Sequence, residues 1–99
     1  MSEKSWSQIL SEQSPELADL SAADTAFLEA DTALPPWIKY LMAMQLDAIA
    51  NRPRGVRHYA QRARELGVTQ EQVVEAVKML RIYGGRPAMV TGAEALRDE

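Results

Sequence analysis

The sequence predicts an all-α fold, a compact orthogonal bundle of about six helices. No segment alternates apolar and polar residues as a strand does. Apolar residues instead recur at helical spacing, and proline, glycine and capping residues punctuate the chain where helices start and stop. Hydrophobic residues make up 46% of the 99 residues, enough for one packed core. A chain this short buries only about 60–65% of its unfolded surface, so stability as a monomer should be modest.

The first 14 residues are predicted to form a helical extension in front of a main domain at residues 15–99. Trp6, Ile9 and Leu10 are spaced as one face of a short helix. The rest of this segment is polar.

Two short helices are expected between Ser14 and Leu34. Ser14 suits the N-cap of the first, and Pro15 suits its first helical position. Ser21 opens a Ser-x-x-Asp step, so we expect the chain to break there and restart around Phe27. Leu34 precedes two prolines, and a residue before proline is disfavoured in the α region, so the segment should end there.

The next helix is predicted over residues 37–50, with Pro36 at its start. Apolar side chains cover most of its circumference, and the strongly polar residues are Lys39, Gln45 and Asp47. A helix with this pattern is typically central in its domain or forms an oligomer interface.

The residues that start and end helices are easiest to recognise in the second half of the chain. Pro53 suits the first turn of a helix running to about Leu66, and Gly67 is placed to close it as the C′ residue. Thr69 should cap the following helix, with Gln72 as its capping-box partner.

The last two predicted helices are separated by a glycine pair. Apolar residues from Val73 to Leu80 favour a helix over about 70–83, which Gly84-Gly85 should stop. Pro87 then suits the start of a last helix reaching Leu96.

Cysteine is absent and histidine occurs once, at His58. The chain therefore has no thiolate nucleophile, no disulfide and no cysteine metal site, and one histidine rules out a multi-histidine metal site within one chain. No apolar run reaches transmembrane length, and no signal peptide pattern opens the chain. We expect a soluble, cytoplasmic protein without membrane contact.

The charge is unevenly distributed. Residues 1–50 carry eight acidic side chains and two lysines, whereas residues 51–99 carry nine basic and six acidic ones, for a net charge of −3. An acidic chain is a poor general binder of nucleic acid. The capped helix after Thr69 could suggest a DNA-reading helix–turn–helix, but Glu71 and Glu75 lie on it and argue against one. The local arginine cluster instead favours a small anion or an acidic surface of another subunit.

The second half, HYAQRARELGVTQEQVVEAVKMLRIYGGRPAMVTGAEAL, resembles the carboxymuconolactone decarboxylase family, which includes the alkylhydroperoxidase D-like proteins. The shared features are a histidine opening a helix, Gly-Val-Thr, a valine-rich helix, and Tyr-Gly-Gly-Arg-Pro-Ala. Leu34-Pro35-Pro36 followed by a lysine and an apolar helix is also similar to the family, so the resemblance covers about residues 15–97.

The resemblance implies an all-helical domain that assembles into homotrimers or homohexamers and needs no metal or organic cofactor. It also implies a Cys-x-x-Cys motif, a histidine and a glutamate in the peroxidase branch. By this resemblance, the cysteine positions hold Arg52 and Gly55, the histidine position holds Tyr59, and the glutamate position holds Tyr40. Thiol peroxidase activity is therefore excluded on chemical grounds.

The candidate catalytic residues are His58, Tyr59 and Tyr40. His58 is suited to acid–base chemistry or to anion binding, or it forms a structural hydrogen bond near the helix start. Tyrosine hydroxyls can donate to an oxyanion, although such residues are often amphipathic side chains at the edge of a core. A one-residue slip rotates a helical side chain by about 100°, so either His58 or Tyr59 faces a pocket.

The candidate substrate-binding residues are arginines near a helix start and aromatic residues around them. Guanidinium groups bind carboxylates in bidentate fashion, but the same groups could form solvated or intersubunit salt bridges. The residues in this set are Arg52, Arg54, Arg57, Trp37, Tyr83 and Arg86.

Two hypotheses follow for function. The first is a cofactor-free lyase, a decarboxylase or isomerase that acts on a small, ring-derived carboxylic acid. The second is a catalytically silent assembly or accessory subunit of the same fold. The cysteines and the glutamate of the peroxidase branch are absent, as expected for a protein whose active site has been lost. Fold alone does not choose between them.

Overall fold

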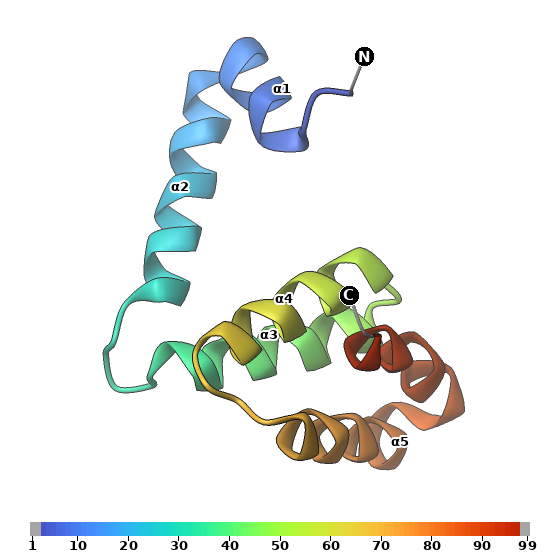
Figure 1. Cartoon of the computed structure of the whole chain (residues 1–99). Helices are drawn as coiled ribbons and strands as arrows, with labels where there is room; N and C mark the ends of the chain where they lie inside the picture. Colours follow the sequence, from blue (N-terminus) through green and yellow to red (C-terminus); the bar gives the residue numbers. More distant parts are fainter. Residues whose placement is uncertain (1–2, 98–99) are drawn as a thin grey trace. The chain divides into compact units, whose positions relative to one another are not determined.

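The computed structural model describes residues 3–97, and every regular element within that range is helical (Figure 1). The chain divides into two compact units, of which the first ends at Ala30 and the second begins at Asp31. The predicted all-α class is confirmed. In place of six α-helices, the described residues form five α-helices and one short 3-10 helix.

The first unit contains helices α1 (Trp6–Gln13) and α2 (Pro15–Glu29), which pack against each other. Ser5 caps α1, and the Ser14 side chain accepts a hydrogen bond from the Leu17 N–H at the start of α2. Neither helix contains a buried residue. The expected break near Ser21 is wrong, because α2 runs through it without interruption. Alanine-rich neighbours have high helix propensity and outweigh the local capping signal.

The second unit is built on the antiparallel pair α3 (Pro36–Ile49) and α4 (Pro53–Glu65), which contact each other extensively. The turn between them is closed by Asn51, which adopts the left-handed conformation with φ 60°. The Arg52 N–H bonds back to the Asp47 carbonyl across this turn, at 2.8 Å. The two helices therefore form a tight hairpin.

Helix α5 (Gln70–Gly92) packs on α3 and then bends back on itself. Gly85 has φ 73° and ψ −170°, a conformation essentially limited to glycine. The stop expected at Gly84-Gly85 is thus a kink between two helical halves. A Cβ on Gly92 would lie 2.4 Å from Leu80 Cδ1, which shows how closely the halves pack. The 3-10 helix η1 (Ala93–Leu96) then contacts α4 and α5.

The core of the second unit lies between these three helices. Its largest fully buried side chains are Met44, Leu80, Val56 and Val73. Gln45 Nε2 donates to the Ala76 carbonyl at 3.1 Å and links α3 to α5. Burying side chains of this size is the main source of stability for the unit.

The predicted C-terminal end of α4 and the predicted start of α5 are confirmed. Gly67 has φ 97°, as the C′ residue of a helix requires. Thr69 and Gln72 form a reciprocal capping box: the Thr69 hydroxyl accepts from the Gln72 N–H at 3.1 Å, and the Gln72 side chain accepts from the Thr69 N–H at 2.8 Å.

We predict that Thr69→Ala lowers the free energy of unfolding by about 1 kcal/mol, because the first turn of α5 loses a hydrogen-bond acceptor. Thr69→Ser is the matched control, since it keeps the hydroxyl, and it should lie close to wild type. Urea unfolding of the three proteins measures the difference. Equal losses in both variants would contradict the capping role.

Candidate functional site

The hairpin of α3 and α4 brings two candidate catalytic tyrosines together. The ring centroids of Tyr40 and Tyr59 are 6.0 Å apart with an interplanar angle of 25°, so the rings stack. Tyr40 is 3% exposed and Tyr59 is half-buried. The positions assigned above to the glutamate and the histidine of the peroxidase branch are therefore adjacent in space.

His58 lies at the outer edge of this pair. Its side chain is exposed, and its ring meets Tyr59 edge-on with centroids 5.1 Å apart. Tyr59 is the residue that turns toward α3, as the helical rotation between consecutive side chains requires. These three side chains thus form a row from the solvent-exposed imidazole of His58, through the half-buried phenol of Tyr59, to the buried phenol of Tyr40.

Arg62 completes this cluster of His58, Tyr59 and Tyr40, which we call the tyrosine group, and it is not among the residues that the sequence predicted for the site. Its guanidinium carbon lies 5.4 Å from the centroid of the Tyr40 ring, and its Nη2 donates to the Tyr40 hydroxyl at 3.5 Å. The hydrogen bonds that Arg62 donates to Tyr40 and to Glu65 raise the pKa of Arg62 above its ordinary value. The available signal was its spacing, since Arg62 follows Tyr59 by three residues and shares its helix face.

Two of the arginines predicted to hold a carboxylate pair with acidic side chains of the same chain. Arg52 Nη1 lies 3.8 Å from Asp47 Oδ1, and Arg57 Nη2 lies 2.5 Å from Glu94 Oε1. Arg54 is exposed. The acids of these two ion pairs lie on different elements, Asp47 on α3 and Glu94 on η1.

Glu94 is the centre of a second charged group at the C-terminal end. Besides Arg57, it accepts from Arg97 Nε at 2.8 Å through both carboxylate oxygens. The hydrogen bonds from Arg97 and Arg57 lower the pKa of the Glu94 carboxyl from 4.5 to about 2. Next to this group, Arg64 Nη2 donates to the Ala95 carbonyl at 2.5 Å. These contacts attach η1 to α4.

The remaining predicted substrate-binding residues lie elsewhere in the second unit. Trp37 lines a groove of about 600 Å³ between α3 and α5. Tyr83 is 79% exposed near the kink in α5. Arg86 borders a different pocket, of about 570 Å³, next to the turn after α3.

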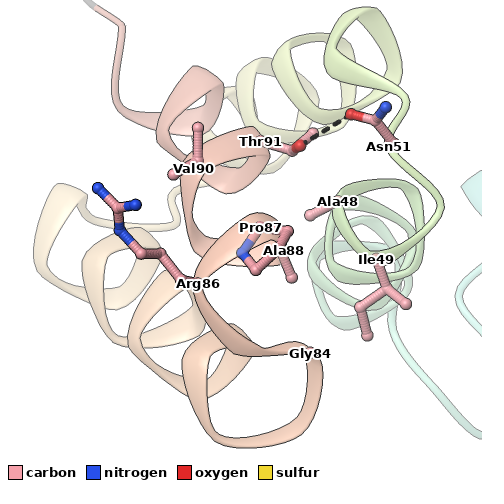
Figure 2. Close-up of a pocket in the computed structure, with 9 residues that line it drawn as sticks. All are labelled: Ala48, Ile49, Asn51, Gly84, Arg86, Pro87, Ala88, Val90 and Thr91. Atoms are coloured by element: carbon pink, nitrogen blue, oxygen red, sulfur yellow. Dashed lines mark hydrogen bonds between the residues drawn. The ribbon is translucent and has the colours of Figure 1, made fainter.

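That last pocket has one polar contact across it. Thr91 Oγ1 donates to Asn51 Oδ1 at 3.0 Å and ties the second half of α5 to the α3–α4 turn (Figure 2). Its other walls are mainly apolar, including Ile49 and Ala88. The guanidinium of Arg86 points away from Asn51 in this view. The residues of the tyrosine group do not line this pocket.

The described residues contain no cluster of three or more His, Asp or Glu side chains that could hold a metal ion. None of their helices is long and apolar enough to cross a membrane.

The arrangement defines a small all-α domain in which an antiparallel helix pair carries a buried tyrosine, a second tyrosine and an arginine. The chain belongs to the carboxymuconolactone decarboxylase family, whose model matches residues 16–98. The predicted family is thereby confirmed, while the boundary after residue 14 stays a prediction.

A solved structure supports the same assignment. The chain is similar to the apo crystal structure of a carboxymuconolactone decarboxylase family protein from Legionella pneumophila, with 28% sequence identity and a TM-score of 0.81. The match covers 90% of this chain and 80% of the other, so it extends into residues 1–30. The comparison with curated proteins finds no significant match.

We predict that Glu94→Gln destabilises the protein at about pH 7 and that the difference from wild type shrinks on acidification. A carboxyl whose pKa is lowered by folding stabilises the native state above its unfolded pKa near 4.5, and that contribution is lost as pH falls toward about 2. Urea unfolding at about pH 7, 5 and 3 measures it. Glu75→Gln, at an exposed position, is the control; a pH-independent loss in Glu94→Gln would contradict the linkage.

Proposed function

We propose that this protein is a cofactor-independent lyase that decarboxylates or isomerises a small carboxylic acid. The observation that carries the proposal is the buried Tyr40 hydroxyl, which accepts a hydrogen bond from Arg62 and lies beside Tyr59. A phenol held in this way can donate its O–H to a developing negative charge, and such preorganised donors are often the largest contribution to catalysis.

The roles follow from the chemistry of enolate formation. In decarboxylation the bond between the carboxylate carbon and its neighbour breaks, carbon dioxide leaves, and the electron pair enters an enolate. Tyr40 donates a hydrogen bond to the enolate oxygen, and Arg62 adds positive charge next to it. Tyr59 or His58 then delivers a proton to carbon. No oxidant or reductant is consumed.

Substrate binding draws on the arginines and aromatic residues named from the sequence. A carboxylate needs a cationic partner, and Arg62 is the guanidinium that contacts the tyrosine pair. Arg52, Arg54, Arg57 and Arg86 contribute to a substrate site only if their side chains rearrange or a second subunit supplies the other wall. Trp37 and Tyr83 would likewise contribute from a neighbouring subunit.

We also propose that the protein works as a cytoplasmic homotrimer or homohexamer. Large apolar side chains of α3 and α5 remain exposed in the single chain, including Leu46 (66%) and Ile82 (75%). Apolar surface of this kind is typically covered by another subunit.

We predict that Tyr40→Phe lowers kcat for release of carbon dioxide by roughly 10²–10³-fold, because removing one oxyanion donor costs about 3 kcal/mol of barrier. Carboxymuconolactone, the lactone acid in the family's name, is the first substrate to assay. Gln61→Ala, an exposed change on the same helix as Tyr59, should leave the rate unchanged. Full activity in a folded Tyr40→Phe protein would exclude the proposed role.

The second candidate function is a catalytically silent assembly or accessory subunit. The observation that favours it is the pairing of Arg52 with Asp47 and of Arg57 with Glu94, which turns predicted substrate-binding groups into structural ones. In this hypothesis the tyrosine pair and Arg62 contribute packing alone.

A thermal-shift screen separates the two hypotheses, because a ligand that binds only the native state raises its stability. We predict that at least one small ring carboxylate raises the Tm of the wild type and that His58→Ala weakens this shift. Arg81→Ala, an exposed change on α5, serves as the control. Absence of any shift across the screen would favour the silent subunit.

A further inference from the structure

A cleft of about 640 Å³ lies in the second unit, where α4 meets the start of α5 and the C-terminal turn. Arg57 and Arg64 line it from α4, where they are two helical turns apart and share a face. Arg97, which follows η1, and Glu94 also line it. The packing of α4 with η1 thus brings three guanidinium groups and one carboxylate to the same cleft.

Glu94 shows that two of these arginines can hold an oxyanion. Its carboxylate accepts hydrogen bonds from Arg97 Nε through both oxygens, at 2.8 Å, and Glu94 Oε1 lies 2.5 Å from Arg57 Nη2. Arg57 and Arg97 also take part in other interactions. A further anion in the cleft would therefore depend chiefly on Arg64.

Arg64 is oriented by uncharged acceptors. Its Nε and Nη2 donate to Gln70 Oε1 at 3.0 and 2.7 Å, and Nη2 also donates to the Ala95 carbonyl at 2.5 Å. Among residues 3–97, Arg64 forms no ion pair, and its Nη1 has no hydrogen-bond partner. Because a guanidinium group stays protonated, a fixed positive charge with two further N–H donors remains at the wall of the cleft.

We propose that this cleft is a binding site for a small dianion, either hydrogen phosphate or a compact dicarboxylate. Arg64 Nη1 donates to an oxygen of the ligand, and hydrogen bonds of this charge-assisted kind are stronger than those between neutral groups. The guanidinium groups of Arg57 and Arg97 add positive charge beside it. Three such groups and one carboxylate, counted within residues 3–97, favour a dianion over a monoanion.

This site is separate from the proposed catalytic group, because neither Tyr40 nor Arg62 lines the cleft. Anion binding can therefore be measured without an assay of activity. Its presence or absence leaves the proposed lyase function untouched.

An NMR titration of the nitrogen-15-labelled full-length chain tests the proposal. The probes are sodium phosphate and sodium succinate, in a mildly alkaline buffer in which inorganic phosphate is mainly a dianion. Sodium acetate is the monoanion, and sodium chloride keeps the ionic strength equal. We predict saturable shifts of the Arg64 Nε–H signal with at least one dianion, at about tenfold lower concentration than with acetate. No saturable shift with either dianion, or equal affinity for acetate, would overturn the proposal.

Gln70→Glu gives a second measurement in a protein that should keep its fold. Glutamate at this position still accepts from Arg64, but it neutralises the positive charge, so we predict that the dianion binds about tenfold more weakly. Gln72→Glu is the matched control: it adds the same charge on the same helix outside the lining of the cleft, and glutamate also suits the capping box. It should bind the dianion as the wild type does. An unchanged affinity in Gln70→Glu, or an equal loss in both variants, would rule out a site at Arg64.

Discussion

Close packing of α4 against α3 is the constraint on which the rest of the second unit depends. The two helices approach closely because small residues face the contact. A Cβ on Gly55 would lie 1.9 Å from Asp47 Oδ2, and Ala60 and Ala63 are fully buried. A larger residue at Gly55 would first displace the Asp47 side chain, whereas larger residues at Ala60 or Ala63 would disturb the buried packing that holds α4 in place.

The bend at Gly85 is the second constraint, and it acts on the opposite end of α4. Because the two halves of α5 pack against each other, the chain returns toward α4 and η1 can contact it. Glu94 and the Ala95 carbonyl then accept hydrogen bonds from arginines on α4. One face of α4 thus supports the tyrosine group while its arginines hold the C-terminal turn.

Local signals in the sequence were sufficient for most of the fold. Gly67 and the Thr69–Gln72 box act through hydrogen bonds and backbone angles within a few residues, so their geometry follows from sequence spacing. The break expected at Ser21 failed because helix propensity over a longer window outweighed one capping pattern. The partners of Arg57 and Arg62 could not be predicted, because Glu94 and Tyr40 approach them only through the packing of separate helices.

The residues that this packing brings together determine the chemistry proposed for the chain. A glutamate and a histidine in contact can pass protons to and from a thiol, but two stacked phenols beside a guanidinium are hydrogen-bond donors with delocalised positive charge next to them. Such a group stabilises an oxyanion better than it removes a proton. In the proposed function, tyrosine at both positions would favour chemistry that builds negative charge on the substrate, and the exposed His58 would be the neighbouring group best suited to exchange a proton with solvent.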